Sequence, residues 1–350
     1  MPSQITENLP ADQESAQKIE SITSLEALRK ILGKPAKILE KRVQSSLDRF
    51  SVEFIEHASA AVLATHNAVM PMQFIDCQKE TSFICDNKRL NLSLHFHDKD
   101  IQPMTVNASL YFMASGIGHS LRVNGRLQVS SNKETKFLIE GIYFHCARAA
   151  ARAKFWECPL EASIADETQR TGLTALEFLS RSPYVLMKTQ GPLSSTEISP
   201  RGDAPGFIHQ IDENTLFIPE RPGNKVAVSL SNIIDQPQIE LLCLIPGTRK
   251  TLNISGYATI TKSPSLLAAC TVNGKQPKLG ILVTIETQQM LEDSILANLN
   301  IWQTQKYVNP KAISSFPKAL SAHMNGTGLL GKATVGVVKA VVNHDMKNLY

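Results

Sequence analysis

Cysteine and long apolar stretches are both scarce in this chain, and each shortage excludes a class of protein. The 350 residues hold six cysteines and no CxxC pair, which indicates reduced thiols and not a disulfide framework. No apolar run approaches the length of a membrane-spanning helix. The polar, acidic start has no basic stretch followed by an apolar core, so we expect no secretory signal. The sequence therefore predicts a cytoplasmic protein without a membrane partner.

The net charge of the chain is also small. Lys and Arg total 36 against 32 Asp and Glu, a formal charge of +4, so bulk electrostatics does not favour a nucleic-acid partner. The sequence also predicts no metal site. His145 and Cys146 are adjacent without further ligands in register, and His95 and His97, which would share a strand face, are expected to serve the surface. With 43% hydrophobic and 19% charged residues, the composition is typical of a globular protein with room for two domains.

Helical patterns follow an expected flexible lead, residues 1–22. Apolar residues recur at helical spacing across 25–32, with Ser24 or Thr23 as the N-cap, and Gly33 and Pro35 end this helix. A second helix is expected over 36–58. Its basic residues are interpreted as a solvated face; they are Lys37, Lys41, Arg42 and Arg49.

Strand-like runs then dominate and occur in two series. The first series is expected at 60–65, 72–76, 82–85, 109–114, 120–129 and 136–144, followed by the helix-forming segment CARAAARAKFW. After a helix at 173–180, the second series is expected at 184–189, 196–199, 207–211, 215–218, 239–245, 251–261 and 279–286, with a short helix or turn within 224–234.

The two series match each other in order. The matched segments are EFIEHASAAVLAT from Glu53 with EFLSRSPYVLMKT from Glu177, and SLRVNG from Ser120 with TLNISG from Thr251, the last two preceded by Gly116 and Gly247. A period this long means two domains and not a solenoid. The expected domains are 23–165 and 166–308, followed by a tail, 309–350, with a helix.

Between residues 182 and 256 the second series carries closely spaced Gly and Pro beside cations. Arg201, Arg221 and Lys225 stand in the segments ISPRGDAPGF and TLFIPERPGNK. Tight turns expose backbone N–H groups, and neighbouring guanidinium or ammonium groups complete a cradle for phosphate. The alternative is a set of ordinary β-turns with solvated charges.

These segments, with SPYVLMKT and LIPGTRKTLNISGYATIT, resemble the FMN-binding split-barrel superfamily of pyridoxamine 5′-phosphate oxidase. The resemblance covers most of residues 174–286, and SLRVNGR and YFHCARAAARAKFW carry it in the first half. It implies a mainly β (α+β) fold: two tandem antiparallel split β-barrels with flanking helices, packed as an internal pseudo-dimer. A tandem duplication of one small barrel would produce this arrangement.

The same resemblance implies an FMN site between two barrels, where one barrel supplies the wall and the other supplies a closing arm with Arg and Trp. The second half keeps the wall and the first half keeps the arm. In the second arm Ser294 and Asn298 stand where Arg148 and Arg152 stand in the first. One composite FMN site per chain is therefore expected. Its implied residues are Arg201, Lys225, Asn224, Arg221, Ser199 and Ser229 from the wall, and Arg148, Arg152 and Trp156 from the arm.

Two of these roles stay open, because Arg221 could brace its turn and Trp156 could pack in the interface. The function implied is an FMN-dependent oxidoreductase acting on a small molecule, with NAD(P)H or oxygen as redox partners. The alternatives are a non-redox flavin- or haem-binding protein and a pseudoenzyme that serves as an interaction scaffold. No residue stands out as an obligatory acid or base; His209 and Tyr184 are candidates by location alone.

Overall fold

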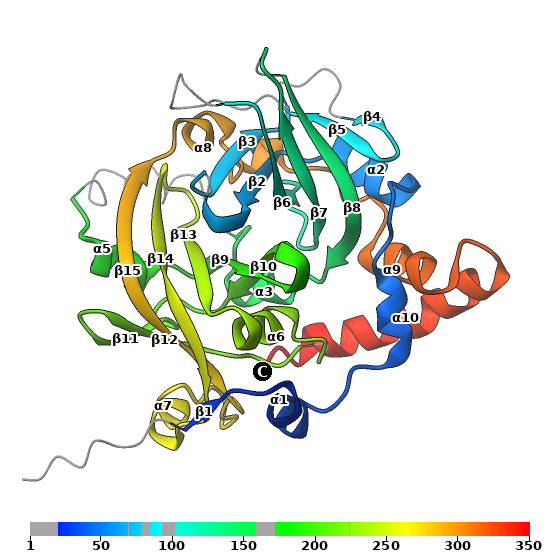
Figure 1. The fold of residues 1–350 in the computed structure, drawn as a ribbon. Coiled ribbons are helices and arrows are strands. Elements are labelled where there is room, and N and C mark those ends of the chain that lie inside the picture. Colours follow the sequence, from blue (N-terminus) through cyan, green and yellow to red (C-terminus); the bar gives the residue numbers. More distant parts are fainter. Residues whose placement is uncertain are drawn as a thin grey trace, which may run out of the picture.

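Two antiparallel sheets pack against each other in the computed structural model (Figure 1). It describes residues 20–68, 70–78, 84–92, 102–132, 134–157, 172–223 and 225–350. Within them the first sheet has the strand order β3-β2-β6-β7-β8-β5-β4. Its strands are β2 (Ala60–Thr65), β3 (Gln73–Asp76), β4 (Ile84–Asp86), β5 (Arg89–Leu92), β6 (Met104–Met113), β7 (Ser120–Val129) and β8 (Thr135–His145).

The second sheet repeats this order with seven equivalent strands, β10-β9-β13-β14-β15-β12-β11. They are β9 (Tyr184–Gln190), β10 (Thr196–Gly202), β11 (His209–Asp212), β12 (Thr215–Pro219), β13 (Gln238–Leu244), β14 (Lys250–Thr261) and β15 (Gly280–Glu292). A β-bulge follows Asn124 in β7 and Ser255 in β14, at matched positions of the repeat. The expected pair of split barrels is confirmed.

Strand alternation builds the core, because successive side chains point to opposite faces of a sheet. On β2, Ala61 and Leu63 enter the core of the first barrel, while Ala60 and Val62 enter a core between the sheets. On β9, Val185 and Met187 enter the core of the second barrel, whereas Tyr184 and Leu186 join the shared core. Both strands are buried along their whole length. This shared core forms the interface of the pseudo-dimer.

The helices lie around the two sheets. They are α1 (Leu25–Leu32), α2 (Arg49–Glu56), α3 (Arg148–Arg152), α5 (Ala175–Arg181), α6 (Val228–Asp235), α7 (Pro264–Ala269), α8 (Ser294–Leu299), α9 (Phe316–Asn325) and α10 (Leu329–Lys347). Among the described residues, no helix is long and apolar enough to cross a membrane.

The expected helix over 36–58 is wrong. Residues 37–42 form a 3₁₀ turn, Val43 is extended, and Gln44 pairs with Ile142 of β8. Helix α2 begins only after Asp48, whose carboxylate accepts from the N–H of Ser51 in a capping box. Pairing with β8 thus overrides the helical pattern of this segment.

The start of the described chain packs on the second barrel, although the sequence grouped it with the first. Ser21–Ile22, at the end of the expected lead, form strand β1 beside β14. Leu28 of α1 is buried in the second core. The N-cap Ser24 and the C-cap Gly33 are as predicted for this helix.

The two closing arms are exchanged between the barrels. Helix α3, which follows β8, packs on β10, and helix α8, which follows β15, packs on β3. The approach of α3 to β10 requires a glycine, since a Cβ atom on Gly202 would lie 2.1 Å from the carbonyl oxygen of Ala149. This exchange brings groups from both halves of the chain to one place.

Candidate functional site

A cavity of about 170 Å³ lies where the exchanged arm α3 meets the second barrel. Its walls also include the end of β8, strand β10, the segment after β12 and the start of α6. Its lining contains one glutamate, Glu220, and five arginines: Arg42, Arg148, Arg152, Arg201 and Arg221. The cavity is thus strongly cationic, and six of the nine site residues implied by the resemblance line it: Ser199, Arg201, Arg221, Ser229, Arg148 and Arg152.

Ser199 and Arg201 come from β10, which is an edge strand and so tolerates Pro200 between them. The Arg201 guanidinium has its Nη2 atom 3.3 Å from the Glu220 carboxylate, and its Nη1 donates to the Pro200 carbonyl at 3.3 Å. Its buried Nε has no hydrogen-bond partner among the described residues. Part of this guanidinium is therefore available to an anion.

Arg221 braces the wall. Its Nε donates to the Asp203 carboxylate at 2.5 Å, and its Nη1 donates to the Cys270 carbonyl at 2.8 Å. Both Arg221 and Asp203 are buried, with side chains 9% and 2% exposed. Because two of its donors are already engaged and its charge is paired with Asp203, Arg221 supports the wall more than it offers hydrogen bonds to a ligand.

Arg148 and Arg152 lie one turn apart on α3 and reach the same carbonyl. Arg148 Nη1 donates to the Pro222 oxygen at 3.1 Å and Arg152 Nη2 donates to it at 3.0 Å. Burial lowers the pKa of Arg152, and the neighbouring Arg148 cation lowers it further. Two guanidinium groups held this close repel each other, so an anion placed between them would be stabilised.

The segment before α6 completes the wall. Lys225 and Ala227 both have left-handed backbone, with φ of 62° and 53°, a conformation uncommon outside glycine. This sharp turn places the start of α6, including the buried Ser229, at the cavity. The first N–H groups of a helix are unpaired within it and attract anions.

Three residues implied by the resemblance are not in the cavity lining that the structure describes. The Lys225 side chain is exposed, its ammonium lies beside Gly33, and its carbonyl accepts from Arg29 at 2.6 Å. Trp156 packs in the interface, where its indole N–H donates to the Ile117 carbonyl at 2.9 Å and its ring contacts Phe155. Asn224 lies outside the described residues.

The acid or base candidates chosen by location do not line the cavity either. Tyr184 is buried in the shared core, where its hydroxyl lies 2.8 Å from that of Tyr111, and burial raises its pKa well above the ordinary value. His209 lies on β11, and burial, followed by the Arg221 cation, lowers its pKa. His95 and His97 lie outside the described residues.

Arg42 is the main residue that sequence reasoning missed, because the expected helix placed it on a solvated face. It is only 8% exposed and lines the cavity. Its guanidinium lies 4.9 Å from the centre of the Tyr143 ring, a cation–π contact. The extended backbone after residue 42, which replaces the predicted helix, turns this side chain inward.

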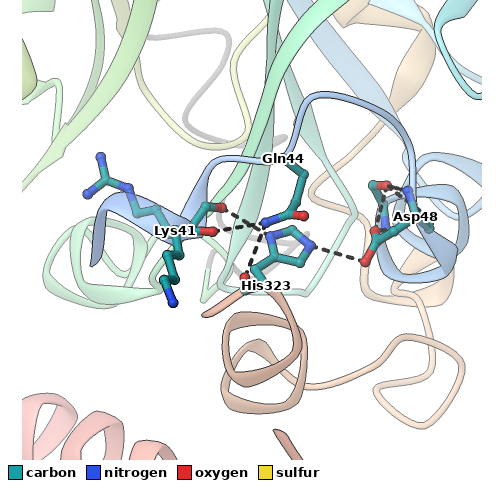
Figure 2. Close-up of polar contacts among 6 residues, drawn as sticks. Lys41, Gln44, Asp48 and His323 are labelled. Atoms are coloured by element: carbon teal, nitrogen blue, oxygen red, sulfur yellow. Dashed lines mark hydrogen bonds and ion pairs between the residues drawn. The ribbon is translucent and has the colours of Figure 1, made fainter. Parts of the chain in front are cut away.

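A histidine from α9 holds the backbone of this segment (Figure 2). The His323 ring lies 3.2 Å from the Arg42 carbonyl through Nδ1 and 3.2 Å from the Asp48 carboxylate through Nε2. Gln44 donates to the carbonyls of Lys41, at 2.9 Å, and of His323, at 3.2 Å. These contacts tie α9 to the segment of chain that carries Arg42.

Behind the cavity lies a second charged group. Arg122, fully buried, pairs with Glu197 at 3.0 Å and stacks 3.9 Å from the centre of the Tyr143 ring. Burial lowers the pKa of Arg122 to about 10 in spite of Glu197.

His145 lines the cavity, and its Nε2 has no hydrogen-bond partner among the described residues. Burial lowers the pKa of His145 well below its ordinary value, and the surrounding arginines lower it further, so the ring is neutral at pH 7.

No protein-family model and no curated protein matches the chain. Several solved structures match a part of it. HupZ of Group A Streptococcus is 16% identical over 34% of this chain and 94% of its own, with a TM-score of 0.29. General Stress Protein 26 of Bacillus anthracis is 11% identical over 34% and 92%, with a TM-score of 0.28. A pyridoxamine 5′-phosphate oxidase-related, FMN-binding protein of Nostoc punctiforme is 16% identical over 39% and 85%, with a TM-score of 0.25.

Proposed function

We propose that the chain is an FMN-dependent oxidoreductase with one flavin site, in the cationic cavity between α3 and the second barrel. The proposal depends on one observation: Arg148 and Arg152 from the first half of the chain line the same cavity as Arg201 from the second half. Guanidinium groups in this number suit a phosphate dianion, which they bind through paired charge-assisted hydrogen bonds. The sequence resemblance supports FMN as the phosphate-bearing ligand.

The donors present fit such a group. Arg201 Nε and His145 Nε2 are buried without hydrogen-bond partners in the described part of the chain, and buried polar atoms are normally paired. The start of α6 adds backbone donors beside Ser229. A ligand phosphate held by Arg148, Arg152 and Arg201 would satisfy the orphaned Arg201 donor.

On the opposite side of the pseudo-dimer, the positions that match these three arginines hold uncharged residues. Strand register pairs Arg201 with Val185 and Ile75 with Ala61, and Val185 and Ala61 are matched positions of the repeat, so Ile75 occupies the place of Arg201. In the second arm, Ser294 and Asn298 replace Arg148 and Arg152. These losses support one site per chain and are consistent with a tandem duplication in which one copy of the site decayed.

FMN, when bound, would supply hydride and electron transfer. The chain would supply the arginines of α3 and β10, which would bind the phosphate. Tyr143 and Glu220, which form part of the cavity wall, would exclude water from part of the site. His145, as a neutral ring, could donate or accept one hydrogen bond inside the cavity. The substrate would be a small molecule and the acceptor oxygen or another oxidant, with NAD(P)H as a candidate reductant.

Loading the purified protein with cofactors tests the proposal. Titration with FMN, riboflavin and haem, followed by absorption and fluorescence, should show saturable FMN binding that is tighter than riboflavin binding. A Soret band without flavin uptake would support the haem-binding alternative. A protein that binds none of the three would be a scaffold and would contradict the proposal.

A further inference from the structure

The last residues of the chain lie on the cationic cavity. Helix α10, drawn in red in Figure 1, runs back across the molecule, and the end of the drawn chain lies beside α6. We define residues 345–350 as the strap. It comprises the last turn of α10 and the three residues after that helix, and it reaches the arginines of the site from outside both barrels.

The strap engages three of those arginines. Asp345 forms an ion pair with Arg148, and the Leu349 carbonyl accepts from Arg152 Nε at 2.7 Å. The Tyr350 ring centre lies 5.8 Å from the Arg152 guanidinium and 5.4 Å from that of Arg221.

The Tyr350 hydroxyl completes the contact at the base of the wall. It donates to the Asp203 carboxylate at 2.5 Å, and burial with this bond raises the pKa of Tyr350 to about 12. Its proton therefore stays in place at pH 7. The backbone oxygen of Tyr350 accepts from Lys275 at 2.8 Å, which fixes the far end of the strap.

These groups are those that an aromatic anion would present to the same arginines. A carboxylate on Arg148, a carbonyl on Arg152 and a ring beside two guanidinium groups correspond to the anionic and aromatic parts of such a ligand. The cavity left beside the strap, about 170 Å³, is below the roughly 300–1,000 Å³ usual for sites of larger small molecules. The strap and the ligand thus compete for one set of donors.

Helix α10 is attached in a way that permits release. Its first turn is held at Gly331, where a Cβ atom would lie 1.7 Å from the Gly326 carbonyl. Along the rest of the helix many side chains are exposed, including Val337 at 66% and Val341 at 55%, and its main contacts are with α9 and α3. Little buried apolar area therefore opposes a swing about residues 326–328.

We propose that the strap is an autoinhibitory segment that occupies the ligand site and must leave Arg148 and Arg152 before an aromatic anion can bind. The proposal rests on the proposed function in that FMN is the ligand. Strap release costs part of the binding free energy of the ligand, so the apparent affinity is lower than that of the open site. Partners or conditions that hold α10 away would activate the site.

The test uses the full chain with the double substitution Asp345→Asn and Tyr350→Ala. Relative to the unmodified protein, the variant should bind FMN and inorganic pyrophosphate at least about tenfold more tightly, because contacts of the strap no longer compete. Lys339→Ala, at an exposed position of α10, is the matched control and should change neither affinity. In the unmodified protein, either ligand should increase hydrogen exchange in α10.

Weaker binding by the double variant would mean that the strap completes the site, and unchanged binding would mean that it is a bystander. Either result overturns the proposal. If FMN binds neither protein while pyrophosphate binds the double variant more tightly, autoinhibition by the strap is supported and the assignment of FMN as the ligand is wrong. If neither FMN nor pyrophosphate binds, both are overturned.

Discussion

Arg152 donates a hydrogen bond to the backbone carbonyl of Pro222, 3.0 Å away, across 70 residues of chain. The two residues belong to different halves of the repeat, and only the exchange of α3 onto the second barrel brings them together. The contact thus joins the arm that carries Arg148 and Arg152 to the turn that follows β12 of the second barrel. Several measurable consequences depend on this pairing of complementary halves.

The number of flavins is the first consequence. Because Ile75, Ser294 and Asn298 replace cations on the opposite side, we expect one FMN per chain at saturation. Flavin released by denaturation can be quantified against protein concentration. A ratio of two would show that the opposite side also binds and would contradict the complementary loss.

Substitutions in the two arms distinguish a composite site between the barrels from a site built within one barrel. Arg152→Ala should weaken FMN binding by about ten- to a hundredfold, since a hydrogen bond to a charged group contributes roughly 1.5–3 kcal/mol. Asn298→Ala, at the matched position of the second arm, should leave the affinity nearly unchanged. Fluorescence titration measures both. The reverse pattern would mean that the active and decayed sites are assigned the wrong way round.

The wall offers a second matched pair. Arg201→Ala should weaken FMN binding more than riboflavin binding, because the phosphate is absent from riboflavin. Lys225→Ala should affect neither ligand, since its ammonium lies beside Gly33 outside the cavity. Parallel titrations with the two ligands provide the comparison. If Lys225→Ala weakened FMN binding as much as Arg201→Ala does, Lys225 would be a phosphate ligand after all.

The strands were easier to predict from the sequence than the residues of the site. Strands such as β2 and β7 were predicted well, because β2 is a continuous apolar run buried on both faces and β7 alternates apolar with polar residues. Arg42 was missed since the pairing of Gln44 with Ile142 is a long-range contact that no local pattern encodes. The strap was missed for the same reason. Lys225 was misplaced because the left-handed turn at Lys225 and Ala227 decides where its side chain points.

Close packing at the arm predicts a sensitive glycine. In Gly202→Ala the new Cβ would lie 2.1 Å from the Ala149 carbonyl oxygen, so α3 must move away from β10. We expect the free energy of unfolding to fall by about 2 kcal/mol or more, with loss of FMN binding. Gly172→Ala, with no atom within 4 Å of its Cβ, should change stability by less than about 0.5 kcal/mol. Denaturant unfolding of the two variants measures the difference, and equal stabilities would mean that α3 can move away from β10 at little cost.

Acid stability should depend on a histidine remote from the cavity. His119 is buried against the Phe54 and Phe144 rings, its Nε2 lacks a hydrogen-bond partner within the described residues, and burial lowers its pKa from 6.5 to about 4. Between these pH values the unfolded chain binds a proton that the folded chain does not. The free energy of unfolding therefore falls as the pH drops from about 6.5 to 4, and this histidine contributes on the order of 2–3 kcal/mol to that loss.

His119→Phe should remove this part of the pH dependence, because a phenyl ring fills the same aromatic surroundings without titrating. Urea midpoints measured from pH 7 to 4 should decline less steeply in the variant than in the unmodified protein. His145, whose pKa is also lowered by burial, should account for part of the slope that remains. His344→Gln on the exposed face of α10 is the matched control. Parallel profiles for His119→Phe and the unmodified protein would mean that His119 is protonated at little cost inside the fold, and that its aromatic surroundings open readily to water.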